Sequence, residues 1–250
     1  MIAGIAAREL RSLFVSPLAW VVLAVVQFLL AWIFLVNLDN YTDHLQELFA
    51  AEPAAPGVTD MVAGPLFGTA ALILLPVVPL LSMRLFSEER RSGTLSLLLS
   101  SPVPLYRIVL GKYLALVAFT AILVLLTAAM PASLAIGTNL DWGKLAAATL
   151  GLGLLVFAFA AAGLYLSLLT AQPVVAAVAT YGLLLLLLMI DWAGGAEDGA
   201  GVMEYLSIIH PFQTLSQGRV VTADVAYYLL FILLFLGLSI HRLDAERLRN

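Results

Sequence analysis

The sequence predicts an all-α integral membrane protein that crosses the bilayer six times. Two observations support this class. Of the 250 residues, 62% are hydrophobic and only 11% are charged, whereas a soluble domain has about 25% charged residues. Because so few charges cannot cover a globule of this size, lipid must be part of the solvent. The apolar residues also gather into six stretches, each close to the roughly 17–25 residues that a spanning helix needs.

In chain order, we expect the six spans at residues 17–36, 61–83, 105–136, 145–169, 173–190 and 223–240. Residues 1–16 precede the first span, and all of these segments belong to one membrane domain over residues 1–250. The fifth and sixth stretches lie near the short limit for a span, so their ends are the weakest boundaries of this prediction.

The lysine and arginine residues predict the orientation. Ten of the 12 fall on one side of a six-span chain, and only Lys144 and Arg219 fall on the other. Since Lys and Arg accumulate on the cytoplasmic side, we expect that side, with both termini, in the cytoplasm. Adding or removing one span would distribute the basic residues over both sides of the membrane, so their positions support the span count as well. The residues on the cytoplasmic side are Arg8, Arg11, Arg84, Arg90, Arg91, Arg107, Lys112, Arg242, Arg247 and Arg249.

Residues 1–16 project as an amphipathic helix. Apolar side chains share one broad face, and Arg8 and Arg11 lie on the other. This pattern predicts a helix in the cytoplasmic interface, with its arginines toward lipid head groups. Glu9 falls inside the apolar arc. Either Glu9 has a partner within the protein, or the segment is only the start of the first span.

The second span contains three prolines, Pro65, Pro76 and Pro79. Each removes a backbone donor and permits a kink. Pro76 and Pro79 lie one turn apart toward the cytoplasmic side, where a hinge would transmit movement from the loop that follows. A purely structural role is the alternative that we favour, since prolines are common in spanning helices.

Two other spans contain residues suited to helix packing. The fourth is rich in alanine and glycine, including Gly151, Gly153 and Gly163. Small residues let helices approach closely in a membrane, so we interpret this span as a packing surface and not as a substrate path. In the first span, Gln27 is the lone strong polar group. It either hydrogen-bonds a neighbouring helix or faces a translocation path.

The loop before the sixth span is unusually apolar. Residues 205–218 contain no Asp, Glu, Lys or Arg. The stretch 205–212 is too apolar for a free loop and too short to span a bilayer. We expect it either to dip into the membrane from outside as a short re-entrant segment or to pack on the helices beneath it.

Several membrane enzymes and transporters depend on residues that this chain lacks. The spans hold no ionisable group at mid-depth, which disfavours proton-coupled transport. Neither G-x-S-x-G nor H-E-x-x-H occurs, and the absence of cysteine excludes a cysteine-ligated metal. Gly111-Lys112 is not a phosphate-binding loop, because Tyr106 and Tyr113 stand where G-x-x-x-x-G-K-[ST] needs Gly and Ser or Thr. We therefore expect no catalytic residues and no metal site, and active transport would need energy from another subunit.

The loop between the second and third spans is the most informative segment. Residues 88–91 form a compact charged cluster. Gly93 is expected to break a helix, and Thr94 to cap the next one by accepting from its free N–H groups. The leucine-rich residues 95–99 then form a short apolar helix, which the prolines that follow end.

A charged turn followed by a short interfacial helix can dock into a groove on a soluble partner and push on the spans behind it. The residues alone favour a simpler alternative, in which Glu88 and Glu89 only pair with arginines at a membrane boundary.

A family resemblance favours docking to a partner over the simpler alternative. The string E-E-R-R-S-G-T-L-S-L-L-L-S-S-P-V at residues 88–103, followed by V-L-G-K-Y at residues 109–113, closely resembles the signature of ABC transporter permeases of the second exporter class. Residues 8–19 are similar to the interfacial elbow helix of that family. Residues 210–221 are similar to its gliding-motility-type branch and to the permease of nitrous-oxide reductase maturation. The resemblance spans the whole chain.

The resemblance implies partners and site residues. In this family the glutamate-rich segment is a coupling helix that contacts a separate ATPase, and two permeases assemble with two ATPase subunits. The second permease would be a copy of this chain or a paralogue. ATP and magnesium would bind to the ATPase, and we expect no cofactor in this chain itself. We also expect no nucleic acid as a partner. The membrane would be the bacterial inner membrane. The implied ATPase-facing residues are Glu88, Glu89, Arg90, Arg91, Gly93 and Thr94, and the implied elbow residues are Arg8, Glu9 and Arg11.

The function implied by the resemblance is that of the membrane subunit of an ATP-driven ABC exporter. Nucleotide binding would move the coupling helices and alter the path between two permeases. The alternative is an ABC-like permease or scaffold that transmits motion to an extracytoplasmic partner without moving solute. A third class, an intramembrane hydrolase, has little residue support.

Overall fold

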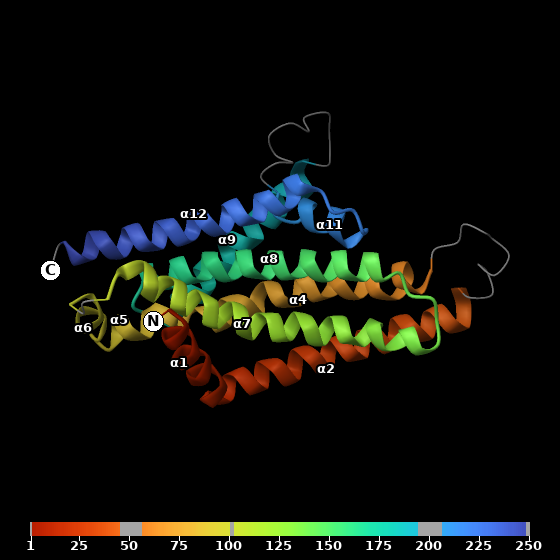
Figure 1. The fold of residues 1–250 in the computed structure, drawn as a ribbon, viewed down its shortest axis with the longest axis horizontal. Coiled ribbons are helices and arrows are strands. Elements are labelled where there is room, and N and C mark those ends of the chain that lie inside the picture. Colours follow the sequence, from red (N-terminus) through yellow and green to blue (C-terminus); the bar gives the residue numbers. More distant parts are fainter. Residues whose placement is uncertain (1, 46–56, 101–102, 195–206, 249–250) are drawn as a thin grey trace.

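The computed structural model describes residues 2–45, 57–100, 103–194 and 207–248, and every regular element in these ranges is helical. Long helices run side by side along the molecule, and both chain ends lie at the same end of the bundle (Figure 1). The elements in chain order are α1 (Ile2–Val15), α2 (Pro17–Asn40), η1 (Tyr41–Leu45), η2 (Thr59–Ala63), α4 (Gly64–Ser82), α5 (Arg84–Arg91), α6 (Leu95–Leu99), α7 (Leu105–Ala132), η3 (Ser133–Ile136), α8 (Trp142–Leu169), α9 (Pro173–Gly194), α11 (His210–Ser216) and α12 (Thr222–Arg247).

In the described part of the chain, five helical segments are long and apolar enough to cross a membrane, and the chain is a multi-pass membrane protein. α9 covers the predicted fifth span. The part of it whose side chains the structure describes, Pro173–Met189, is a shorter apolar helix than the five segments given below. The six-span topology and its orientation stay predictions. The five segments are Pro17–Asp43, Thr59–Arg91, Leu105–Ile136, Trp142–Leu169 and Thr222–Arg247.

Several helices continue past the apolar stretches that mark them in the sequence. α2 runs to Asn40 and α12 to Arg247, beyond the predicted span ends at residues 36 and 240. Polar residues can continue a helix, and neither extension contains a glycine or proline that would stop it. The length of an apolar stretch therefore underestimates the length of its helix.

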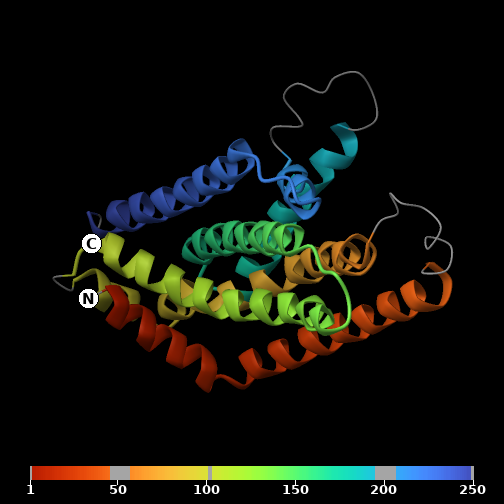
Figure 2. The same cartoon turned by 45° about the vertical axis from the view of Figure 1, so that its right-hand side comes forward.

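The chain turns sharply between α1 and α2, so that α1 lies at an angle to the helix that follows (Figure 2). Ser16 makes this corner with an extended backbone, at a ψ of 127°. Pro17 then begins α2, because its fixed φ suits the first helical position. The predicted N-terminal helix is present, and its position in a membrane interface stays a prediction.

α4 passes through Pro76 and Pro79 and ends at Ser82. The carbonyl oxygen of Pro79 accepts from the backbone N–H of Met83 at 2.9 Å and from Ser82 Oγ at 3.2 Å. Met83 forms the turn that separates α4 from α5. The prolines thus lie just before the charged helix α5, and their role as a hinge stays a prediction.

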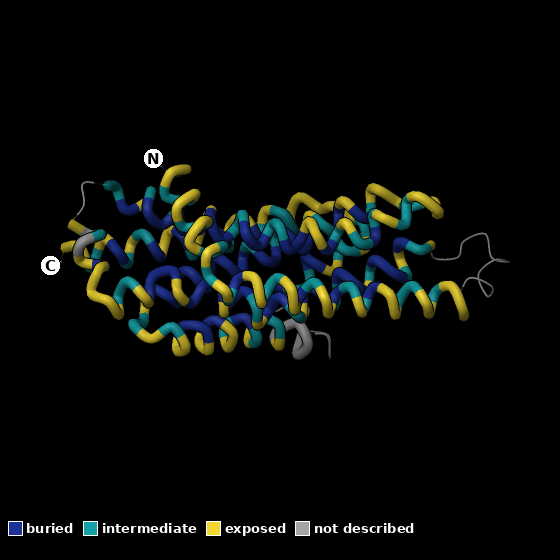
Figure 3. Tube along the Cα trace, turned by 90° about the horizontal axis from the view of Figure 1, so that it is seen from below, coloured by how far each residue is buried: buried dark blue, intermediate teal, exposed yellow. Residues whose placement is uncertain are grey.

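α8 forms the centre of the bundle. Helices α4, α7, α9, α11 and α12 all pack on it, and it is the most buried of the spanning segments. Gly151 lies directly under Leu215 of α11, and Gly163 lies against Ser82 of α4. These contacts confirm close packing at Gly151 and Gly163. At Gly153 an added Cβ would meet only Phe157 of α8 itself, at 3.9 Å. Buried residues line the inside of the bundle and exposed ones its outward faces (Figure 3).

Gln27 makes a hydrogen bond to a neighbouring helix. Its Nε2 donates to the carbonyl oxygen of Leu123 in α7 at 3.1 Å. This contact confirms the first of the two predicted alternatives for Gln27, since it ties α2 to α7 in the apolar part of the bundle.

The apolar segment before α12 packs on the helices beneath it. Ile208, Phe212 and Leu215 are buried, and α11 lies along α8. The hydroxyl of Tyr228 in α12 donates to the carbonyl oxygen of Ile208 at 2.7 Å. These contacts support the packing alternative, although residues 205–206 of the predicted segment lie outside the described part of the chain.

The end of the bundle opposite the termini is held by polar contacts between η2 and the start of α8. Lys144 Nζ pairs with Asp60 at 2.8 Å. The side chain of Asp141 caps α8 by accepting from the backbone N–H of Lys144 at 3.1 Å. The backbone N–H of Asp141 donates to Thr59 Oγ1 at 3.1 Å. Two of these contacts, Lys144–Asp60 and Asp141–Thr59, therefore join the ends of two spanning segments, and the third caps α8 itself.

Replacing Gly163 with alanine is expected to destabilise the bundle. The added Cβ would lie 2.1 Å from Ser82 Oγ and 2.8 Å from Ser82 Cβ. α4 and α8 must then move apart, which costs about 1–3 kcal/mol. Thermal unfolding in detergent would show this as a lower midpoint.

Gly237→Ala on α12 is the matched control, because no atom lies within 4 Å of its added Cβ. The better helix propensity of alanine should leave its midpoint unchanged or higher. Equal midpoints for Gly163→Ala and Gly237→Ala would contradict a tight contact between α4 and α8.

Candidate partner-docking site at the basic end

The end of the bundle that carries both termini is rich in basic residues. We call it the basic end and define it by Arg8, Arg84, Arg90, Lys112 and Arg242. Ion pairs and a shared cleft bring these residues together from α1, α5, α7 and α12. These contacts thus gather five of the ten basic residues that the sequence assigned to one side, and Arg249 lies outside the described residues.

α5 is a short charged helix with a buried inner side. Leu85 and Phe86 are buried. Arg90 and Arg91 occupy the last turn, where positive charges interact favourably with the helix dipole. Gly93 ends this segment with a φ of +73°, a conformation that glycine adopts without steric cost. α6 begins two residues later, so the predicted helix break at Gly93 is confirmed.

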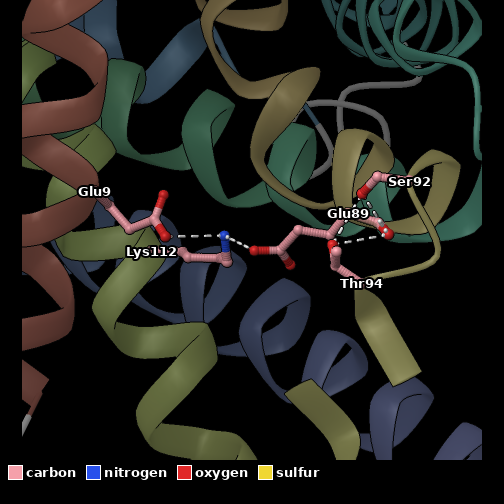
Figure 4. A network of polar contacts seen from close by, with 5 residues as sticks. All are labelled: Glu9, Glu89, Ser92, Thr94 and Lys112. Carbon is pink, nitrogen blue, oxygen red and sulfur yellow. Dashed lines mark hydrogen bonds and ion pairs between the residues drawn. The ribbon is translucent and has the colours of Figure 1, made fainter. Parts of the chain in front are cut away.

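Thr94 does not cap α6, contrary to the sequence-based prediction. It occupies the N-cap position, but its backbone is helical and its side chain makes no cap hydrogen bond. Its hydroxyl instead lies 2.9 Å from Ser92 Oγ and donates to the carbonyl oxygen of Glu89 at 3.4 Å. Ser92 Oγ donates to the same oxygen at 3.3 Å (Figure 4). The prediction failed because an N-cap needs an extended backbone, and both hydroxyls close the end of α5.

Lys112 is the centre of the ion-pair network. Its side chain is 4% exposed, and its Nζ lies 2.8 Å from Glu89 Oε1 and 3.2 Å from Glu9 Oε1. The same ammonium group lies 5.0 Å from the centre of the Phe86 ring, within the range of a cation–π contact. A single lysine of α7 therefore holds carboxylates from α1 and α5 (Figure 4).

A second ion-pair group fixes α5 to the end of α12. Arg90 Nη2 pairs with Glu246 Oε1, and Arg242 Nε lies 3.4 Å from the same oxygen. The Arg90 and Glu246 side chains are 25% and 18% exposed. Adjacent residues of α5, Glu89 and Arg90, therefore reach in two directions, one toward α7 and the other toward α12.

Within residues 88–94, the residues other than Glu89 and Arg90 are exposed. In the described chain, the ion pair of Glu88 is with Arg84 on its own helix, at 3.3 Å, and its side chain is 56% exposed. We call the exposed residues of this segment the docking face: Glu88, Arg91, Ser92, Gly93 and Thr94. The six residues assigned to an ATPase-facing surface from the sequence thus divide into two groups. Glu89 and Arg90 hold α5 to the bundle, and the other four lie on the docking face.

The elbow residues of α1 also divide. Glu9 has a partner within the protein, Lys112, which confirms the first alternative for the carboxylate that interrupts the apolar face of α1. Arg8 and Arg11 are exposed, so their guanidinium groups are accessible at the basic end. Contact of these arginines with lipid head groups stays a prediction.

Sequence reasoning did not find the roles of Lys112 and Glu246. Lys112 was placed only at the foot of a span, and Glu246 was not singled out. The available signal for Lys112 was its position among apolar residues of a long helix, since a buried ammonium group requires a counter-ion. Nothing local in the sequence connects residue 246 with residue 90.

A family model described as ABC-2 family transporter protein matches residues 3–248. The match covers α1, the docking face and the ion-pair network at the basic end, together with all the spanning segments. No curated protein matches the chain.

Arg90→Met and Glu246→Met are expected to be energetically coupled. Each single variant leaves one charge of a partly buried pair without its partner, whereas the double variant removes both. A double-mutant cycle of unfolding in detergent should give a coupling free energy of about 1 kcal/mol. The exposed pair Arg84 and Glu88 is the control, with about 0.2–0.5 kcal/mol expected. Additive effects of Arg90→Met and Glu246→Met would contradict the pairing.

Proposed function

The chain belongs to the ABC-2 transporter family, and on that premise we propose that it is the membrane subunit of an ATP-driven exporter whose docking face receives a separate ABC ATPase. Members of this family are membrane components of ABC transporters, so an ATPase partner follows from the family. The docking face as the point of contact, and export as the direction, are our proposals.

The position of the docking face supports this proposal. Four of its residues are exposed at the basic end: Glu88 and Arg91 in the second half of α5, and Ser92 and Thr94 in the turn that leads to α6. They present both charges and hydroxyl groups, which suit a polar interface with a soluble protein. The left-handed Gly93 sets the direction in which α6 leaves this turn. The docking face is thus a small and well-defined surface.

The attachment of the docking face supports a role in transmitting force. Glu89 and Arg90 come from the same helix as Glu88 and Arg91, and they hold α5 to α7 and α12 through partly buried ion pairs. α5 also follows α4 after the single turn at Met83. A displacement of the docking face would therefore reach spanning segments directly, without an intervening flexible loop.

The proposal includes the arrangement of the complex. Six spans, with α9 as the fifth, would place the basic end and both termini in the cytoplasm of a bacterium, where an ATPase has access. Two permeases, identical or paralogous, would pair with two ATPase subunits that bind ATP and magnesium. The basic residues gathered at this end agree with a cytoplasmic location.

Co-purification of the ATPase tests the docking face. We expect Glu88→Ala combined with Arg91→Ala to weaken ATPase binding at least about tenfold, which corresponds to about 1.4 kcal/mol. Both side chains are exposed, so the fold should be kept. Glu89 is left intact, because its loss would also disturb Lys112. The measurement is the ratio of ATPase to tagged permease after detergent purification of the co-expressed pair.

The matched control is Asp244→Ala combined with Arg247→Ala. It removes one acid and one base from exposed positions of α12 at the same end of the bundle. This control should retain ATPase binding. If the Glu88 and Arg91 double variant also retains full binding, the docking face is wrong.

A further inference from the structure

α1 and α5 face each other across a cleft at the basic end. The cleft has a volume of about 290 Å³, and its walls include Arg8, Glu9 and Ser12 of α1 and Arg84 and Glu88 of α5. In the described residues, α1 and α5 do not pack extensively on one another. Something other than direct side-chain packing must therefore fix the position of one helix relative to the other.

α1 instead packs tightly on α7. Gly111 lies directly under Ile5, and a Cβ added to Gly111 would lie 2.6 Å from Ile5 Cγ2. This close approach makes α1 and the first turns of α7 a single body at the basic end. α5, in contrast, packs on α8 and α9, so it belongs to a different part of the bundle.

Lys112 joins these two bodies. It follows Gly111 in α7, and its ammonium group is held between Glu89 of α5 and Glu9 of α1. A lysine has three donors and can serve two carboxylates at once. With 4% of the side chain exposed, the contacts of Lys112 are screened by salt much less than those of a surface pair.

We propose that Lys112 is a positioning residue that makes the N-terminal helix α1 follow α5 when an ATPase displaces the docking face. This inference rests on the proposed function and adds a route for the motion. Movement of α5 passes through Glu89 to Lys112 and the first turns of α7, on which α1 is packed. α1 then carries it through the Ser16 corner into α2. The first spanning segment thereby moves together with the second.

Pulsed electron paramagnetic resonance tests this route. The chain contains no cysteine, so spin labels can be placed without removing native thiols. Ala7→Cys on α1, Arg84→Cys on α5 outside the docking face and Thr138→Cys at the opposite end are all exposed positions. Each pair of labels is measured in the complex with its ATPase, first without nucleotide and then trapped with ATP and vanadate. Dilution with unlabelled chain keeps the measured distances within one permease.

In the native complex, nucleotide should change the Ala7–Thr138 and Arg84–Thr138 distances while the Ala7–Arg84 distance stays constant. In Lys112→Met, the Arg84–Thr138 change should persist, the Ala7–Thr138 change should be largely lost, and the Ala7–Arg84 distance should now vary. ATPase binding should be unchanged, because Lys112 is buried and lies outside the docking face. Arg247→Met, which removes an exposed cation at the same end, should behave like the native chain.

Glu89→Met keeps the test decisive if Lys112→Met does not fold, since it breaks the same link from the α5 side and leaves the Lys112–Glu9 pair in place. It should reduce the Ala7–Thr138 change without altering the Arg84–Thr138 change. The inference is overturned if α1 follows α5 in the tested variants as it does in the native complex, or if only the label on α5 moves in the native complex. If the ATPase binds but neither label moves in the native complex, the proposed coupling itself is wrong.

Discussion

A lysine buried in an apolar helix needs carboxylate partners, and this need determines the arrangement of the basic end. Transfer of the Lys112 ammonium group out of water costs several kcal/mol unless opposite charges and hydrogen bonds replace its hydration. Within the described chain, Glu9 and Glu89 are the carboxylates that meet it. α1 and α5 are far apart in the sequence, but both must converge on the same turn of α7. The docking face takes its position from that convergence.

The rest of the bundle is held together by a different kind of contact. In lipid, helices gain little from burying apolar surface against one another, so close packing of small residues becomes important. α8 follows this rule, with Gly151 under Leu215 and Gly163 against Ser82. Apolar packing therefore fixes the helices through the membrane, and ion pairs fix their relation at the basic end. Forces applied to the docking face act first on the ion pairs, which lie nearest to it.

The sequence was sufficient for the class of fold and for the helix break at Gly93. Hydrophobic stretches are a property of local composition, and they located the segments that are long and apolar enough to span. The conformational freedom of glycine predicted the break at Gly93. Composition could not show which charges pair, because Lys112 and Glu9, or Arg90 and Glu246, come together only through the tertiary fold. The expected Thr94 cap failed for a related reason, since the backbone geometry after Gly93 is set by the contacts of Glu89 with Ser92 and Thr94. Helix ends such as Asn40 and Arg247 were missed because polar residues continue a helix beyond the apolar stretch.

The central claim is that the docking face lies on the cytoplasmic side, where an ATPase can reach it. Labelling of single cysteines with a membrane-impermeant maleimide in intact cells tests this claim most directly. Ser92→Cys should be protected in intact cells and react only after the membrane is permeabilised, whereas Thr138→Cys at the opposite end should react in both conditions. The chain is expressed without its ATPase, so that no partner covers Ser92. Both positions are then exposed, and protection reports on the side of the membrane and not on burial. Reaction of Ser92→Cys in intact cells, with protection of Thr138→Cys, would contradict the account.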